Sequence, residues 1–253
     1  MQKEAWICTI AGTVLGALGC LLRWLQCEMI FDEVTGLPTK GAGISTLMVL
    51  LLALMTAGLW WLSGRISVPT VSEEPEDAMT ATNKVVSGVL IFASLVAGAG
   101  AAYMFLTEES TLLRVTALLG LLSAPLPALY PSLSRWGGFG ALLSLFPVVF
   151  FSVWLVAFYK DHAVNPVVWE YGMEILTITV CLFAAYRVSG CMYYRLHMRR
   201  TVFACMLALT VCLTILMDRA PASARFLLLG WGLGFGGICW LLLRSVPVPE
   251  EEQ

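Results

Sequence analysis

The chain has 253 residues, of which 59% are hydrophobic and 13% are charged, and its mean hydropathy is +0.83. A soluble domain carries about 25% charged residues, so most of this surface cannot face water and a soluble domain is excluded. The net charge of −2 offers no basic surface, which excludes binding to nucleic acid.

Eight apolar stretches follow one another along the chain, each close to the roughly 20 residues that a helix needs to cross a bilayer. They cover 5–27, 44–63, 85–106, 111–130, 138–159, 166–189, 201–217 and 226–243. No strands of alternating polarity appear, which excludes an outer-membrane barrel. The sequence therefore predicts an all-α polytopic transmembrane helical bundle of about eight helices. We expect a single transmembrane domain over 1–253, surrounded by the lipid bilayer.

Small residues mark the faces through which these helices are expected to pack, because they let two backbones approach closely in lipid. The first stretch carries them on one face, at Gly12, Gly16 and Gly19. The last stretch carries two interleaved pairs with four-residue spacing, Gly230 with Gly234 and Gly232 with Gly236. Both stretches are therefore predicted to pack closely against neighbouring helices.

The basic residues predict the orientation of the bundle. If eight spans alternate in direction, nine Lys and Arg lie on the side of the N-terminus and six on the other side. Arg195, Arg199 and Arg200, between the sixth and seventh stretches, contribute most to this difference. Cytoplasmic connections carry the excess of Lys and Arg. We therefore expect both termini and the acidic loop 64–84 in the cytoplasm, in a multi-pass protein of the cell membrane.

Three prolines interrupt the fourth stretch, at Pro125, Pro127 and Pro131. Each proline lacks a backbone donor and clashes with the preceding turn of a helix, so the hydrogen bonds between Leu121 and Tyr130 should show a break. Broken helices mark binding sites in many transporters, although prolines also end helices for structural reasons alone. The pattern leaves both interpretations open.

Two carboxylates lie at the start of the sixth stretch. Asn165 is a good N-cap and Pro166 suits the first helical position, which places Glu170 and Glu174 four residues apart on one helix face. Glu174 should lie roughly 12 Å beyond Pro166, inside the hydrocarbon. A carboxylate at that depth must be paired or take up a proton, so it should face protein or a cavity rather than lipid.

Three arginines at the same predicted end of the bundle are candidate partners for these acids: Arg114, Arg225 and Arg23. One interpretation is a binding site for a ligand, a cation or a proton. A second is a structural Glu–Arg clamp between helices, and a third is that the acids are simply exposed at the interface. Trp169 and Tyr171 lie beside the acids and are candidates for stacking on a ligand.

Motifs of catalysis and of cofactor binding do not appear in the sequence. The loop residues Asp161 and His162 are too few for a metal site. The sequence has no H-E-x-x-H, G-x-S-x-G or Walker motif, and its eight cysteines have no C-x-x-C pair, which favours buried thiols over disulfides or zinc. We therefore expect no cofactor and no enzymatic activity.

The segment from Tyr159 to Leu176, together with Ala185 to Gly190, resembles uncharacterised bacterial multi-pass membrane proteins. The similarity consists of a Tyr-[Lys/Arg]-Asp loop, a short spacer, Asn-Pro or Asp-Pro, and a polar-aromatic pair that opens a helix. That family has no assigned activity. The resemblance implies a bacterial cell membrane and leaves the function open.

The leading functional hypothesis from the sequence is binding or transport of a small solute or ion. The residues expected to form the site are Glu170, Glu174, Arg114, Arg225, Trp169 and Tyr171. The alternative is a non-catalytic membrane subunit or sensor that recruits an unidentified cytoplasmic protein. That partner would bind Arg195, Arg199 and Arg200 or the acidic loop 64–84.

Overall fold

The computed structural model describes residues 2–29, 43–66, 83–162, 168–193 and 197–244, with the backbone alone for 2–4, 134 and 168–170. Over these ranges the chain is helical and contains no strand. The helices are α1 Gln2–Met29, α2 Gly43–Arg65, α3 Lys84–Thr107, α4 Thr111–Ser123, α5 Leu126–Leu133, the 3₁₀ helix η1 Ser134–Trp136, α6 Gly137–Ser144, α7 Phe146–His162, α8 Val168–Met192, α9 Met198–Thr214, the 3₁₀ helix η2 Ile215–Met217 and α10 Ala222–Arg244. The predicted all-α bundle is confirmed.

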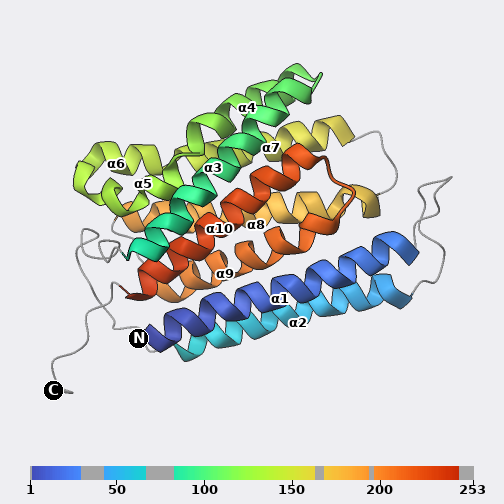
Figure 1. Ribbon diagram of the computed structural model, residues 1–253, viewed down its shortest axis with the longest axis horizontal. Helices are drawn as coiled ribbons and strands as arrows, with labels where there is room; N and C mark the ends of the chain where they lie inside the picture. Colours follow the sequence, from blue (N-terminus) through green and yellow to red (C-terminus); the bar gives the residue numbers. More distant parts are fainter. Residues whose placement is uncertain (1, 30–42, 67–82, 163–167, 194–196, 245–253) are drawn as a thin grey trace.

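The helices run along the long axis of one elongated bundle (Figure 1). At one end, here called the distal end, α1 and α7 finish and α2, α8 and α10 begin. At the other, the proximal end, α1 begins and α10 finishes, in keeping with an even number of crossings. Which end faces the cytoplasm stays a prediction.

Seven helical segments of the described chain are long and apolar enough to cross a membrane, with α6 and α7 together forming one of them. The pair α4 and α5 makes an eighth crossing if the two helices, bent by 42° at their junction, count as one span. The protein is therefore a multi-pass membrane protein, and the count of eight crossings and their predicted bounds stay a prediction.

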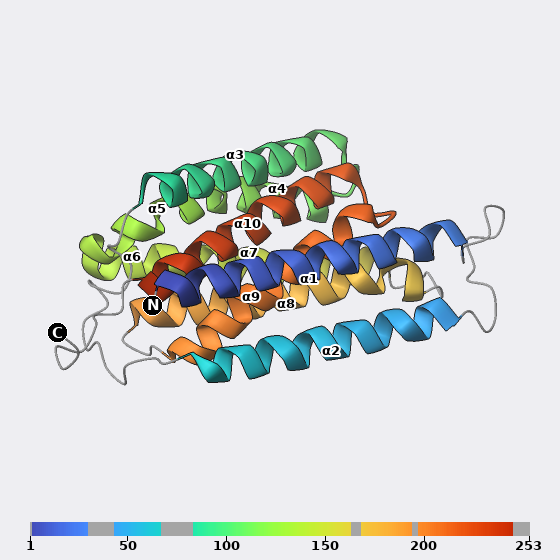
Figure 2. The ribbon, with the colours of Figure 1, turned by 60° about the horizontal axis from the view of Figure 1, so that its bottom comes forward.

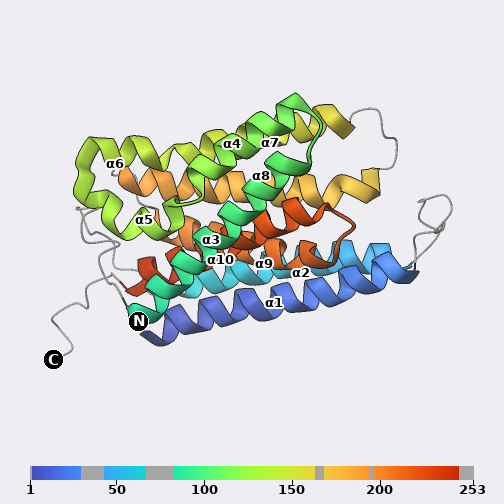
Figure 3. The same ribbon diagram turned by 45° about the horizontal axis from the view of Figure 1, so that its top comes forward.

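The predicted break in the fourth stretch is confirmed between Ser123 and Leu126. Pro125 and Pro127 have no backbone N–H, and the N–H of Ala128 donates instead to Ser94 Oγ of α3 at 3.1 Å. A neighbouring helix thus supplies the acceptor that the broken helix lacks, as membrane helices with internal proline require. Figure 3 shows that α5, beyond the break, lies with α6 at the proximal end.

Glycines bring α1 and α10 into close contact with their neighbours, as predicted. A Cβ added at Gly16 of α1 would lie 2.8 Å from the Cβ of Leu213 in α9. One added at Gly230 of α10 would lie 2.7 Å from the backbone oxygen of Ala93 in α3, and Gly232 faces Cys212 of α9. Backbone proximity of this kind is the usual source of helix association in lipid.

The centre of the bundle is α10, which packs against both α3 and α9. Its Trp231 and Phe235 meet Phe151 of α7 with ring centroids 5.3 and 6.4 Å away, all three side chains being buried. By contrast α2 lies at the rim of the bundle, beside α1 (Figure 2). The arrangement gives a buried centre around α10 and a peripheral pair of helices, α1 and α2.

Candidate functional site

Three charged side chains are at least nine-tenths buried among those that the structure describes: Arg23, Glu174 and Asp218, with exposed fractions of 1%, 5% and 5%. All three lie at the distal end. Arg23 is near the end of α1, Glu174 follows the start of α8 by about 9 Å, and Asp218 comes directly after η2. Charged groups at such depth are uncommon and usually functional in membrane proteins, so we take this cluster as the candidate site.

Arg23 and Asp218 form an ion pair, with Arg23 Nη2 donating to Asp218 Oδ1 at 2.7 Å. The other terminal nitrogen of Arg23, Nη1, donates to Gln26 Oε1 at 2.7 Å. Gln26 in turn donates from Nε2 to Ser45 Oγ of α2 at 3.1 Å. This chain of hydrogen bonds joins α1, α2 and the segment between η2 and α10.

Asp218 is held in place by backbone groups of η2 and of the next residue, Arg219. Its backbone N–H donates to the oxygen of Ile215 at 2.9 Å, and its Oδ1 also accepts from the N–H of Arg219 at 2.8 Å. Its second oxygen, Oδ2, is buried and accepts no hydrogen bond from the described part of the chain. Half of this carboxylate is therefore without the stabilisation that a buried acid normally has.

Glu174 is buried, as the sequence predicted, and in the described part of the chain it has neither a hydrogen bond nor an ion pair. The charged groups that act on it are Asp218 and Glu108, both acidic. The three buried groups thus comprise one positive and two negative charges when all are ionised. One more positive charge is needed for neutrality.

Glu108 links this cluster to the surface of the distal end. It caps α3, with its N–H donating to the oxygen of Met104 at 3.0 Å. Partial burial raises the pKa of the Glu108 carboxyl above its usual value, Asp161 raises it further, and His162 lowers it. The exposed side chains of Asp161 and His162 are therefore within electrostatic range of Glu108.

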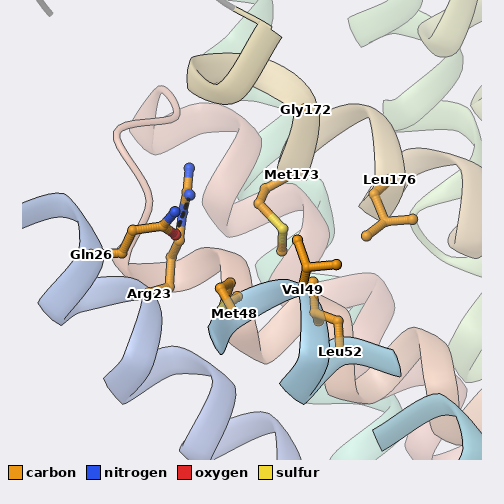
Figure 4. A pocket seen from close by; sticks show the side chains of 8 residues that line it. All are labelled: Arg23, Gln26, Met48, Val49, Leu52, Gly172, Met173 and Leu176. Carbon is orange, nitrogen blue, oxygen red and sulfur yellow. Dashed lines mark hydrogen bonds between the residues drawn. The ribbon is translucent and has the colours of Figure 1, made fainter. Parts of the chain in front are cut away.

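A cavity of about 380 Å³ lies between α1, α2 and α8 (Figure 4). Its lining residues are Arg23, Gln26, Met48, Val49, Leu52, Gly172, Met173 and Leu176. The polar groups belong to α1 alone, and the side chains from α2 and α8 are apolar. Figure 4 shows the guanidinium of Arg23 beside Gln26 at one side, with the apolar side chains from α2 and α8 beyond them.

The structure does not join the predicted arginines to Glu174. Arg114 is exposed and donates from Nε to the backbone oxygen of Glu108 at 2.6 Å. Arg225 is half-buried and donates from Nη1 to the backbone oxygen of Leu216 at 3.3 Å. Each arginine thus binds a carbonyl at the end of a helix, and the clamp between Glu174 and either of them is not formed.

The predicted aromatic and acidic neighbours of Glu174 are only partly described. The ring of Tyr171 lies 5.4 Å from that of His162 and 6.5 Å from that of Phe158, so it faces α7. The side chains of Trp169 and Glu170 lie outside the described residues. Their roles, and the pairing of Glu170 with Glu174, stay predictions.

Two of the three predicted partner-binding arginines lie at the proximal end. Arg199 and Arg200 are exposed at the start of α9. Arg195 and most of the acidic loop 64–84 lie outside the described residues. Nothing in the described part of the chain tests their contact with a partner.

Asp218 and Gln26 were missed by sequence reasoning. Asp218 falls one residue beyond the predicted span 201–217, so the apolar pattern alone does not indicate that it is buried. Gln26 falls within the first stretch, where a polar residue three positions after Arg23 was the available signal. Polar residues spaced three apart near a helix end share a face and can form one cluster.

No family model matches the chain, and no curated protein or solved structure is significantly similar to it. The family resemblance drawn from the sequence thus stays a prediction. In the described part of the chain no group of three or more His, Cys, Asp or Glu is placed to hold a metal ion. No disulfide joins any of the eight cysteines within the described part of the chain.

Proposed function

We propose that the protein transports a small solute or ion across the membrane and that Glu174 carries a proton in the transport cycle. The observation that carries this proposal is the unbalanced charge at the distal end, where the buried charged side chains of the described residues are one cation, Arg23, and two carboxylates, Glu174 and Asp218. Burying an ionised Glu174 without a partner would cost several kcal/mol of free energy relative to water. A bound cation removes this penalty.

A proton fits the described groups better than a metal ion. Hard cations such as Ca²⁺ require six to eight oxygen ligands, and no group of that kind gathers around Glu174 in the described part of the chain. A proton needs only one carboxylate. Proton relays in pumps and transporters are built from chains of Asp, Glu and His.

Electrostatic interactions relate Glu174 to ionisable groups nearer the surface of the distal end. Glu108 interacts electrostatically with Glu174 on one side and with Asp161 and His162 on the other. The side chains of Asp161 and His162 are 47% and 32% exposed, so they can exchange protons with water. Asp218, paired with Arg23, also acts electrostatically on Glu174.

The two arginines that the sequence offered as partners of Glu174 at this end, Arg225 and Arg114, bind backbone carbonyls instead. Arg225 donates to the oxygen of Leu216, and Arg114 donates to that of Glu108. Neither supplies Glu174 with the missing positive charge. This leaves protonation as the means by which the carboxyl group of Glu174 becomes neutral.

The test is proton flux through proteoliposomes that contain a trapped pH-sensitive dye and carry a potassium diffusion potential. The wild-type protein and Glu109→Gln, an exposed acid at the same end, should acidify the lumen when the inside is negative. Glu174→Gln should abolish this flux while eluting as a folded species in gel filtration. Equal flux in all three proteins, or flux that follows a sodium gradient instead of the proton gradient, would overturn the proton assignment.

The exposed Arg199 and Arg200 support the second candidate, a membrane subunit or sensor that recruits a cytoplasmic partner. The two candidates respond oppositely to two changes. A transporter should tolerate deletion of 69–77 in the acidic loop and fail on Glu174→Ala. A recruiting subunit should lose its activity in cells on the deletion and keep it on Glu174→Ala.

A further inference from the structure

Arg23 belongs both to the ion pair with Asp218 and to the wall of the cavity between α1, α2 and α8. We propose that this cavity binds an amphipathic monocarboxylate, and that binding is coupled to the uptake of one proton. The ligand's carboxylate takes the place of Asp218 on Arg23, and Asp218 becomes protonated. This inference names the solute for the proposed function and rests on it for the neutral state of Glu174.

The lining of the cavity indicates the charge of its ligand. Of the eight lining residues, Arg23 is the charged one, and Gln26 beside it carries an amide. Arg23, which is paired with Asp218, and Gln26 thus form one end of the cavity, and the rest of the lining is apolar. An anionic head fits this end by charge complementarity.

The carboxylate class follows from the present partner of Arg23. Its guanidinium already receives a carboxylate oxygen of Asp218 at 2.7 Å, and the planar fork of arginine matches carboxylate geometry. A ligand carboxylate in the cavity would approach the same guanidinium. Asp218 binds Arg23 through Oδ1, and its second oxygen, Oδ2, accepts no hydrogen bond from the described part of the chain. Asp218 therefore uses only one of its two oxygens in the ion pair.

The remaining walls suit an apolar body. They consist of Met48, Val49 and Leu52 from α2 and Met173 and Leu176 from α8, and methionine adapts readily to different apolar shapes. A closed apolar cavity of about 150 Å³ is enough to bind benzene. At about 380 Å³, this cavity has room for a larger molecule with a short hydrocarbon chain.

Charge balance fixes the number of protons. Without ligand, Arg23 is positive, Asp218 is negative and Glu174 holds a proton, so the buried cluster is neutral. With the ligand, Arg23 pairs with the ligand carboxylate, and Asp218 loses its counter-charge. A buried unpaired carboxylate is too costly to persist, so Asp218 accepts one proton from solvent. The sum of charges in the buried cluster is again zero, so one proton is taken up for each anion that binds.

The test is isothermal titration calorimetry of the detergent-solubilised protein with octanoate, repeated in buffers of different ionisation enthalpy to count protons. The inference predicts saturable binding with one proton taken up per octanoate. Octanol and octylammonium, which share the chain but not the carboxylate, should not compete. Binding of octanoate without proton uptake, or equal binding of octylammonium, would overturn the inference.

Two tryptophan substitutions on α2 locate the binding. Leu52→Trp fills the cavity without touching the ion pair and should weaken octanoate binding by about tenfold or more. Leu54→Trp is the matched control, because Leu54 is 70% exposed on the same helix, and it should bind as wild type does. If Leu52→Trp binds octanoate as tightly as Leu54→Trp does, the cavity is not the site.

Glu174→Gln separates a failure of this inference from a failure of the proposed function. Asp218 is the group that takes up the proton, so the variant should still bind octanoate with one proton. A wild-type count of two protons, reduced to one in Glu174→Gln, would show that Glu174 is ionised without ligand. That result would contradict the proposed function and leave the carboxylate site standing. Zero protons in both proteins would overturn the site itself.

Discussion

Arg23 and Asp218 are 195 residues apart in the chain, and their side chains meet at 2.7 Å. Each side chain is only 2% exposed, so the pair joins α1 to the connection between η2 and α10 inside the distal end. Gln26 extends the same network to Ser45 of α2. The peripheral helices α1 and α2 are thereby fastened to the central ones by polar contacts at this end.

Breaking this pair from one side should destabilise the protein strongly. Asp218→Asn leaves Arg23 buried without a counter-charge, and the expected loss is about 3–5 kcal/mol in the free energy of unfolding. Replacing both partners, as in Arg23→Met with Asp218→Leu, should restore much of that loss because no buried charge remains. Denaturant unfolding in detergent measures both. Losses that simply add would mean that the pair is not coupled.

Glu108 should make the stability depend on pH. Partial burial, with Asp161 nearby, raises the pKa of this carboxyl in the folded protein. Its stabilising contribution is therefore complete below its usual value of about 4.5 and is lost as the pH rises through the folded value. Glu108→Gln should remove this loss, and Glu109→Gln should keep it. The measurement is the midpoint of thermal unfolding across the acid range, and identical curves for the two variants would contradict the assignment.

Gly230 should tolerate no side chain. An alanine Cβ there would meet the backbone of α3, 2.7 Å from the oxygen of Ala93. Overpacking of this kind costs about 1–3 kcal/mol. Gly58→Ala in α2 is the control, since its Cβ would meet nothing within 4 Å, and it should be neutral or stabilising because alanine favours helix. Thermal unfolding in detergent compares the two, and an equal midpoint would show that α3 and α10 can separate without loss.

The orientation predicted from the basic residues places the proximal end in the cytoplasm. Reporter fusions after Gln253 and after Lys160 test it, because Lys160 is exposed near the distal end of α7. The fusion at Gln253 should report a cytoplasmic position and the fusion at Lys160 the opposite side. A cytoplasmic reporter at Lys160 would reverse the orientation and with it the side from which Glu174 is reached.

The helices and the depth of Glu174 could be predicted because both are local properties of the sequence. Long apolar stretches predict spans, prolines predict the break after Ser123, and a carboxylate inside an apolar stretch is visible at once. The choice of ion partner was not predictable in this way. Arg23, Arg114 and Arg225 each lie at the distal end of an apolar stretch, and only tertiary packing makes the first buried, the second exposed and the third half-buried.

The protonation of Glu174 in the membrane is the central claim, and infrared difference spectroscopy measures it most directly. At neutral pH the carbonyl stretch of a protonated carboxyl group should be present in the wild-type protein and in Glu109→Gln. In Glu174→Gln that band should be missing, with no equivalent loss of the ionised carboxylate bands. A spectrum of Glu174→Gln that keeps the protonated band and loses intensity from ionised carboxylate would show that Glu174 is charged, and would contradict the account.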